Sequence, residues 1–337
     1  SSVIERSTGY FDLNCFFMTG TFAIKLINLT GSPPVVSRTF LSVRIACLLM
    51  LLALACSFQT NHNSVMKTIA FFGATGMLGQ PVANELALQG FEVRALLRDP
   101  SKAEGQLHPD IRILKGDLKD KAAVNRTLEG SDLAYISLSV DPATGRKDYQ
   151  PEREGVQALL QAAGKHSIKG VGYLSSLVQR YQGMQGFDWW AFELKNQTVR
   201  RIRESGLPYL LFYPSTFMEN FDQGNYRQGN RITLAGKSEH PMHFIAGRDY
   251  ARQVSQAFLQ FEGQSREYVI QGPQAYTADE AAAIFTQYFE REQLSISKLP
   301  YGLLGFLGNF TNTFNYGAKI VKALNRYPEK FEAAENW

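Results

Sequence analysis

Three glycines at positions 73, 76 and 79 form the most informative group of residues in the chain. They lie in "FFGATGMLGQ" (71–80), between an apolar run and a helical pattern. Without a Cβ, Gly73 permits a tight exit from a strand, Gly76 lets a phosphate approach the backbone, and Gly79 lets the helix pack against the sheet. The start of the helix adds free N–H groups and the positive end of its dipole. The motif and its context therefore predict a pyrophosphate site of a dinucleotide rather than an ordinary strand–turn–helix. The loop amides would come from Thr75, Met77 and Leu78.

The end of the next apolar run indicates which dinucleotide is bound. An acidic residue usually binds the adenosine ribose of NAD, whereas an arginine accommodates the 2′-phosphate of NADP. Here the run ends in "LLRDPSK". The guanidinium group of Arg98 could bind a phosphate through two hydrogen bonds, and Lys102 would supply a second cation. Asp99 directly follows Arg98, so both cofactors stay open. The pattern favours NADP, and NAD is the alternative cofactor. A simpler interpretation of Arg98 is an exposed charge in a loop, with no role in binding.

Composition and the remaining reactive residues exclude several other classes. The net charge of +4 is small and spread over 337 residues, which does not favour a nucleic-acid partner. No Gly-x-Ser-x-Gly elbow of a hydrolase is present. The histidines after residue 66 lack acidic or cysteine neighbours at metal spacing, so no metal site is expected. They are His108, His166, His240 and His243.

The elements that must position these residues alternate between strands and helices. Near-continuous apolar runs separated by amphipathic helices predict a parallel sheet covered on both faces. The expected fold is α/β, a doubly wound Rossmann sheet with strand order 3-2-1-4-5-6 and its ligand at the carboxyl edge. The expected strands are 67–72, 91–97, 111–117, 133–140, 170–176 and 208–214. The expected helices are 77–89, 120–129, 150–165 and 188–205.

The regular alternation of apolar strands and amphipathic helices ends at about residue 214. We expect 66–214 to form the NAD(P)-binding core and 215–337 to form a small substrate lobe on the carboxyl edge, interleaved with the core. Its expected elements are a helix at 247–261, a strand at 266–270 and a helix at 277–291. The apolar, aromatic stretch 301–324 favours core packing, with a lid over an apolar substrate or a membrane-touching surface as alternatives.

Together these motifs resemble the NmrA-like family of the atypical short-chain dehydrogenase/reductase superfamily, over residues 67 to about 290. The resemblance is carried by "GATGMLG", "LLRDPSKA" (96–103), "GDL" (116–118), "LPYLLFYPSTFMENF" (207–221) and "GPQAYTADEAA" (272–282). It implies that Asp117 and Leu118 border the adenine ring. It also implies that Ser137, in the stretch 137–139, lies beside the nicotinamide, and that Ser175 falls at the active-site serine and orients a substrate carbonyl.

The resemblance raises a catalytic question in the helix "WWAFELKNQTVRRIRESG". Short-chain dehydrogenases usually use Tyr-x-x-x-Lys, in which the lysine holds the nicotinamide ribose and lowers the pKa of the tyrosine. Lys195 is present here, but Ala191 replaces the tyrosine. Some NmrA-like reductases keep only the lysine, so Lys195 would bind the ribose and serve as general acid or base. An apolar pocket would be lined by Trp189, Trp190, Phe217, Met218 and Asn220.

Two main functions follow from this resemblance. The first is an NADPH-dependent reductase acting on a small apolar carbonyl, enone or quinone, with Lys195 and Ser175 as its catalytic residues. The second is a protein that binds NADP(H) without turnover, as a sensor, regulator or assembly factor, and Ala191 keeps it open. A sugar-nucleotide epimerase is disfavoured by the missing tyrosine.

Residues 1–65 differ from the rest of the chain and hold all three cysteines. The apolar run "IACLLMLLALACSF" (45–58) follows Arg38 and Arg44 and resembles a signal-peptide core. "MKTIAFFGATG" from Met66 resembles a natural start, which makes 1–65 a leader or non-native extension outside the fold. A cytoplasmic location is expected, with targeting, anchoring or membrane contact through residues 38–58 as the alternative.

Overall fold

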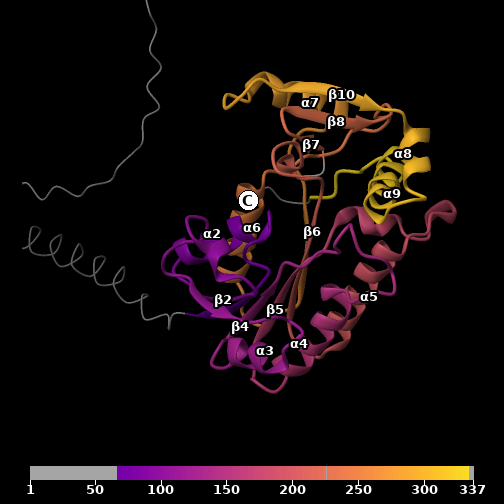
Figure 1. Cartoon of the computed structure of the whole chain (residues 1–337). Coiled ribbons are helices and arrows are strands. Elements are labelled where there is room, and N and C mark those ends of the chain that lie inside the picture. The colour runs from indigo at the N-terminus through magenta and orange to yellow at the C-terminus, as the bar shows by residue number, and fades with distance from the viewer. Residues whose placement is uncertain (1–66, 225, 334–337) are drawn as a thin grey trace, which may run out of the picture. The chain divides into compact units, whose positions relative to one another are not determined.

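Seven parallel strands form the central sheet of the protein (Figure 1). The structure, a computed structural model, describes residues 67–224 and 226–333. The sheet order β3-β2-β1-β4-β5-β6-β9 confirms the predicted Rossmann order and adds β9 beyond β6. The strands are β1 (Thr68–Phe72), β2 (Glu92–Leu97), β3 (Arg112–Lys115), β4 (Leu133–Ile136), β5 (Gly170–Leu174), β6 (Tyr209–Pro214) and β9 (Arg266–Ile270).

Helices cover both faces of this sheet (Figure 1). Alternate side chains of β1 enter opposite cores: Ile69 and Phe71 join one, and Ala70 and Phe72 join the other. All four are almost fully buried, which explains why the strand is apolar at every position. One face is covered by α2 (Gly79–Leu88) and α6 (Gly247–Leu259). The other is covered by α3 (Lys121–Leu128), α4 (Val156–Ala163) and α5 (Trp190–Glu204).

Two of the expected elements differ most from the structure. β4 ends at Ile136 instead of running to residue 140, because its partner β1 ends at Phe72. The N–H of Ser137 makes the last bond, 2.9 Å from the Phe72 carbonyl, before Gly73 turns away. The helix expected at 150–165 begins as a π-helical turn, η2 (Pro151–Gly155), and continues as α4.

The segment after β6 is divided between the sheet and a smaller layer. Strand β9 pairs with β6 at the edge of the large sheet, and helix α6 packs on one face of that sheet. A separate three-stranded sheet of order β10-β8-β7 lies in the upper part of Figure 1. Its strands are β7 (Arg227–Gln228), β8 (Arg231–Ala235) and β10 (Ser295–Leu299), accompanied by α7 (Ala278–Tyr288). The final helices are α8 (Tyr301–Leu307) and α9 (Asn312–Arg326). Single turns are η1 (Pro100–Ala103), η3 (Leu177–Tyr181), η4 (Met184–Gly186) and η5 (Met218–Phe221).

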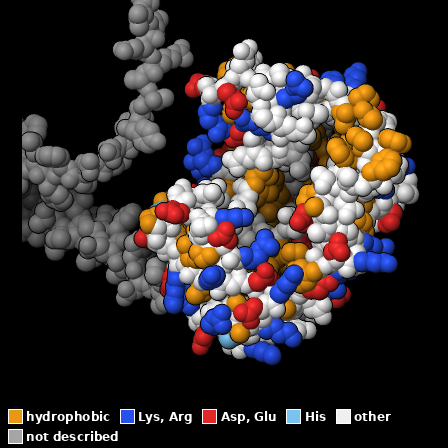
Figure 2. Space-filling view, in the orientation of Figure 1, with side chains coloured by type: hydrophobic (Ala, Val, Ile, Leu, Met, Phe, Trp, Pro, Cys, Tyr) orange, Lys and Arg blue, Asp and Glu red, His pale blue; other side chains and the backbone are white. Residues whose placement is uncertain are grey.

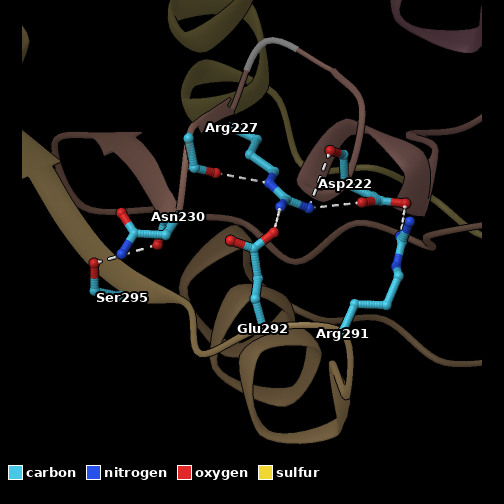
Figure 3. A network of polar contacts seen from close by, with 7 residues as sticks. Asp222, Arg227, Asn230, Arg291, Glu292 and Ser295 are labelled. Atoms are coloured by element: carbon cyan, nitrogen blue, oxygen red, sulfur yellow. Dashed lines mark hydrogen bonds and ion pairs between the residues drawn. The ribbon is translucent and has the colours of Figure 1, made fainter.

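A cluster of charges ties this smaller layer together (Figure 3). Asp222 accepts from Arg227 at 2.7 Å and from Arg291. Arg227 also pairs with Glu292, so the carboxylates and guanidinium groups alternate along the network. Both guanidinium groups lie over the ring of Phe289, at 4.9 Å for Arg227 and 4.7 Å for Arg291. These contacts join the segment after η5 to the loop before β10.

The apolar stretch 301–324 packs on only one side. Leu304, Ala323 and Leu324 are buried, but Phe306 and Phe310 are 58% and 70% exposed. Hydrophobic side chains gather on the surface over α8 and α9 in Figure 2. Within residues 67–224 and 226–333, no helix has the length and apolar character needed to cross a membrane. The predicted leader, its apolar run 45–58 and the three cysteines lie outside the described residues.

Candidate functional site

The three glycines after β1 have different structural needs. Gly73 has φ +96°, and a Cβ there would lie 2.1 Å from the carbonyl oxygen of Ser137. A Cβ on Gly79 would lie 1.9 Å from the Gly73 carbonyl oxygen, so both of these glycines are required by the fold. A Cβ on Gly76 would meet only the Gly73 oxygen at 3.4 Å, an ordinary contact, and would otherwise point into open space. The fold does not need a glycine at 76, whereas a phosphate approaching the backbone does.

The loop between these glycines offers free hydrogen-bond donors. The amide of Gly76 donates to Gly73 at 3.2 Å, but the amides of Thr75, Met77 and Leu78 have no acceptor in the described part of the chain. Leu78 caps α2 without a side-chain hydrogen bond. Unpaired amides at a helix start, beside open space at Gly76, form a cradle that suits a pyrophosphate.

The end of β2 presents two exposed cations. Arg98 and Lys102 are exposed and have no ion pair among the residues described. Asp99 points back into its own turn, where its carboxylate accepts from the hydroxyl of Ser101 at 2.7 Å and from its amide at 3.1 Å and so caps η1. These hydrogen bonds lower the pKa of Asp99. The acid that follows Arg98 is therefore already engaged within the chain.

The predicted adenine border lies after β3. Asp117 accepts from the amide of Lys119 at 2.9 Å, which fixes the turn into α3. Leu118 is half-buried and lies 3.5 Å from where a Cβ on Gly155 would be. Tyr149 lies nearby, because its hydroxyl is 3.2 Å from the same Cβ position on Gly155. Burial, and then the charge of Asp117, raise the pKa of Tyr149. Its buried hydroxyl has no partner in the described structure.

A cavity of about 540 Å³ opens at the carboxyl edge of the sheet. Figure 2 shows a hollow there with hydrophobic side chains on its floor. Its walls come from the ends of β4, β5 and β6, from α5, and from the smaller layer with α9. Lining residues include Leu138, Ser175, Lys195, Phe217, Asn220 and Tyr316. The two residues predicted to be catalytic, Lys195 and Ser175, thus share one cavity.

Lys195 is held by a buried carboxylate. Its Nζ lies 2.5 Å from Oε1 of Glu152, whose side chain is fully buried in the π-helical turn η2. The same Oε1 accepts from the hydroxyl of Tyr173 at 2.9 Å, and the Glu152 backbone carbonyl accepts from Thr198 at 2.9 Å. Burial, followed by the charge of Glu152, raises the pKa of Tyr173 well above its usual range. These contacts fix the position of the Lys195 ammonium at the cavity wall.

Ser175 presents an unpaired hydroxyl. Its side chain is 3% exposed, and Oγ has no partner among the described residues. A buried hydroxyl without a partner costs free energy, and such groups frequently mark a ligand site. The hydroxyl therefore suits a ligand oxygen brought into the cavity.

The apolar residues expected around the pocket divide into two groups. Phe217 and Asn220 line the cavity, while Met218 is 43% exposed on η5. Trp189 and the half-buried Trp190 instead join an apolar cluster at the start of α5. Ser137 lies at the end of β4, where its backbone closely faces Gly73.

Sequence reasoning missed two residues of this site. Glu152 stands in "PEREG" among other charged residues and gave no sign of burial. Tyr316 lies in a stretch interpreted through its apolar character alone. A buried acid facing a lysine of another helix depends on tertiary packing, so no local pattern identifies it. Within the residues described, no cluster of three or more His, Cys, Asp or Glu side chains is arranged to hold a metal ion.

A comparison with known protein families gives a match over most of the chain. A model of the NmrA-like family matches residues 65–329. The chain belongs to the NmrA-like family. This match confirms the resemblance inferred from the glycine loop and the later motifs.

Several characterised proteins are similar to this NmrA-like chain in sequence. (4-Alkanoyl-5-oxo-2,5-dihydrofuran-3-yl)methyl phosphate reductase of Streptomyces griseus is 29% identical over 223 residues, which cover 65% of this chain and 73% of that protein. Quinone oxidoreductase 2 of Escherichia coli is 25% identical, with 65% and 73% covered. Photosystem II assembly factor Ycf39 of Cyanophora paradoxa is also 25% identical, with 76% and 79% covered.

Solved structures share the fold. The triphenylmethane reductase of Citrobacter sp. in complex with NADP(H) aligns with TM-score 0.59 at 15% identity, covering 81% of this chain and 93% of that one. The quinone oxidoreductase QOR2 of Escherichia coli in complex with NADPH aligns with TM-score 0.56 at 19% identity, covering 76% and 86%. These similarities agree with the Rossmann architecture of the large sheet.

Proposed function

We propose that this NmrA-like protein is an NADPH-dependent reductase of a small apolar carbonyl, enone or quinone. The observation that carries the proposal is that Lys195 and Ser175 line one apolar cavity at the carboxyl edge of the sheet. The general assignment to NAD(P)H-dependent oxidoreductases is supported by relatives named as quinone and azo reductases. The bound nicotinamide would supply the hydride.

Each part of the chain then contributes to binding. The amides of the 73–79 loop bind the pyrophosphate, and Arg98 and Lys102 bind the 2′-phosphate. Asp117 and Leu118 border the adenine, Ser137 lies beside the nicotinamide, and Lys195 binds its ribose. Ser175 orients the substrate carbonyl by donating its unpaired hydroxyl. Phe217 and the apolar wall exclude water from the reacting atoms.

A second function is favoured by one residue. Ala191 has no proton to transfer, and relatives that include the photosystem II assembly factor Ycf39 match 76% of this chain. The chain would then bind NADP(H) as a sensor, regulator or assembly factor without turnover.

One experiment separates the two functions. The protein is mixed with NADPH and, in turn, 4-nitrobenzaldehyde, chalcone and menadione, and the absorbance of the reduced nicotinamide is followed over time. Oxidation of NADPH that depends on one of these substrates supports the reductase. Tight NADPH binding with no oxidation across the panel supports the non-catalytic function and contradicts the reductase.

The cofactor preference has its own test. We expect Arg98→Ala to weaken NADPH binding by about tenfold or more, because one charge-assisted contact to phosphate is lost, and to leave NADH binding unchanged. Lys165→Ala, an exposed lysine just after α4 at the amino edge of the sheet, is the matched control. An Arg98→Ala protein that keeps its preference for NADPH would contradict the assignment.

A further inference from the structure

The alanine at position 191 leaves α5 without the phenol that short-chain dehydrogenases place one turn before the lysine. The side chain of Ala191 is buried in an apolar cluster together with Trp189 and Phe192. Tyr316 of α9 packs against this same cluster. A phenol from a different element therefore packs against the apolar cluster that contains the Ala191 side chain.

Several contacts fix this phenol at the cavity. The rings of Tyr316 and Trp189 meet edge to face, with centroids 4.8 Å apart, which holds the tyrosine by an aromatic pair. Tyr316 lines the cavity with Lys195 and Ser175. No hydrogen bond to the Tyr316 hydroxyl is found in the described part of the chain. The ring is anchored and the hydroxyl is available to a ligand.

The proton state of Tyr316 suits donation. Burial, and then the charge of Glu152, raise the pKa of Tyr316 to about 12. The Tyr316 side chain lines the same cavity as Lys195, the ion-pair partner of Glu152. At neutral pH the hydroxyl is therefore protonated. An alkoxide is more basic than a phenolate, so proton transfer from Tyr316 to an alkoxide is favourable.

We propose that Tyr316 is the catalytic proton donor of this site, a role that rests on the proposed reductase function. As a hydride adds to the carbonyl carbon, the electron pair of the C=O bond moves to oxygen. The O–H bond of Tyr316 breaks, its proton joins that oxygen, and the product is an alcohol. The phenolate then regains a proton from water. Each turnover thus consumes one hydride from the cofactor and one proton from solvent.

Neither neighbouring residue is as well suited to donate this proton. Donation by Lys195 would leave the fully buried Glu152 carboxylate without its cation, which is costly in a buried site. Ser175 has an aliphatic hydroxyl, whose anion is about as basic as the alkoxide it would protonate. Lys195 and Ser175 therefore hold the ribose and the carbonyl, and Tyr316 supplies the proton.

The variant Tyr316→Phe tests this assignment because it keeps the ring and removes only the hydroxyl. With 4-nitrobenzaldehyde and NADPH, we expect kcat to fall about 10²-fold or more, the usual contribution of a general acid. The residual rate should also fall as pH rises, since the proton must then come from solvent. Menadione reduction should fall less, because hydride addition to a quinone yields a stabilised phenolate.

Binding measurements give a readout besides turnover. Calorimetry should show an unchanged Kd for NADPH in Tyr316→Phe. The second ligand is 4-nitrobenzamide, a carbonyl compound that is not reduced. The Kd of the NADPH-bound variant for this compound should be about fivefold higher than that of the NADPH-bound wild type, as expected for one lost hydrogen bond. Tyr181→Phe is the matched control: Tyr181 belongs to the same cluster, burial also raises its pKa to about 12, and it does not line the cavity.

The possible outcomes separate the two proposals. Equal rates and pH profiles for wild type and Tyr316→Phe with 4-nitrobenzaldehyde would overturn the role of Tyr316 and leave the reductase intact. Equal losses in Tyr316→Phe and Tyr181→Phe would also overturn it, because a general packing effect would explain both. A wild type that binds NADPH but reduces nothing in the panel would overturn both proposals.

Discussion

At the scale of single residues, the glycine loop separates folding from binding. Gly73 and Gly79 face backbone oxygens closely enough that no side chain fits, so they are needed with or without a cofactor. Gly76 faces open space and is not in the left-handed region. The same motif thus contains two glycines that the fold requires and one, Gly76, that it does not require and that we assign to the proposed ligand.

This difference gives a prediction with a built-in control. We expect Gly76→Ala to fold with a melting temperature close to wild type, yet to bind NADPH at least about tenfold more weakly, because its Cβ would keep the pyrophosphate from the backbone. Gly79→Ala should instead lower stability by about 2–4 kcal/mol, since the helix must move away from the sheet. Thermal denaturation and NADPH fluorescence titration measure the two effects. A Gly76→Ala protein with unchanged NADPH affinity would contradict the placement of the pyrophosphate.

The candidate site residues that the sequence indicates all belong to short local patterns. The glycines, Arg98 and Lys195 each follow from a motif or from spacing along one element. Glu152 and Tyr316 reach the cavity from segments distant in sequence, and only packing brings them to Lys195. Long-range pairs of this kind carry no periodic signal, which is why the buried acid and the phenol were missed.

At the scale of elements, the large sheet was predictable and the smaller layer was not. The central strands β1, β4 and β5 are buried at every position and therefore appear in the sequence as near-continuous apolar runs. Strand β7 has only two residues, β8 is buried at alternate positions and β10 is largely exposed, so no continuous apolar run marks these three strands. Charged contacts such as those in Figure 3, rather than a continuous apolar run, hold part of this layer together.

We expect Asp222→Asn to lower the free energy of unfolding by about 1–3 kcal/mol, since it breaks charge-assisted hydrogen bonds at a largely buried arginine. The side chains of Asp222 and Arg227 are only 18% and 16% exposed. Arg291→Met is the matched comparison: Arg291 pairs with the same carboxylate from an exposed position and should cost less than about 1 kcal/mol. Urea denaturation measures both. If both variants lose the same free energy of unfolding, the burial of the Arg227 and Asp222 side chains does not determine how much this network stabilises the fold.

At the scale of the whole molecule, the two edges of the large sheet have different properties. The carboxyl edge holds the cavity, together with loop amides and the Ser175 hydroxyl, which have no partner within residues 67–224 and 226–333. At the amino edge the polar groups are paired: Asp132 accepts from the amide of Thr68 at 2.9 Å and from Lys169 at 2.6 Å. This bridge links the start of β1 to the segment before β5. We therefore expect stability to depend on the amino edge and ligand binding on the carboxyl edge.

The bridge at Asp132 predicts a pH dependence of stability. Burial acts to raise the pKa of Asp132, but the hydrogen bonds from Lys169 and Thr68 outweigh it and the pKa is lowered. A carboxyl whose pKa is lower in the folded state stabilises the fold above its unfolded pKa of about 3.9, and this contribution disappears as the pH falls through the folded value. Asp132→Asn should therefore be less stable than wild type at pH 7 by about 1 kcal/mol, since Lys169 is exposed. The difference should shrink below about pH 4.

Urea denaturation of both proteins across this pH range measures the effect, and Asp110→Asn, a carboxylate on the surface, is the control that should show no comparable change. Binding of NADPH should stay the same in Asp132→Asn, because the substituted residue lies at the opposite edge from the glycine loop. A stability gap of equal size at pH 7 and at low pH would show that the loss comes from packing and not from the charge of Asp132. A change in NADPH affinity would show that the two edges are coupled through the sheet, against the separation argued from their hydrogen bonds.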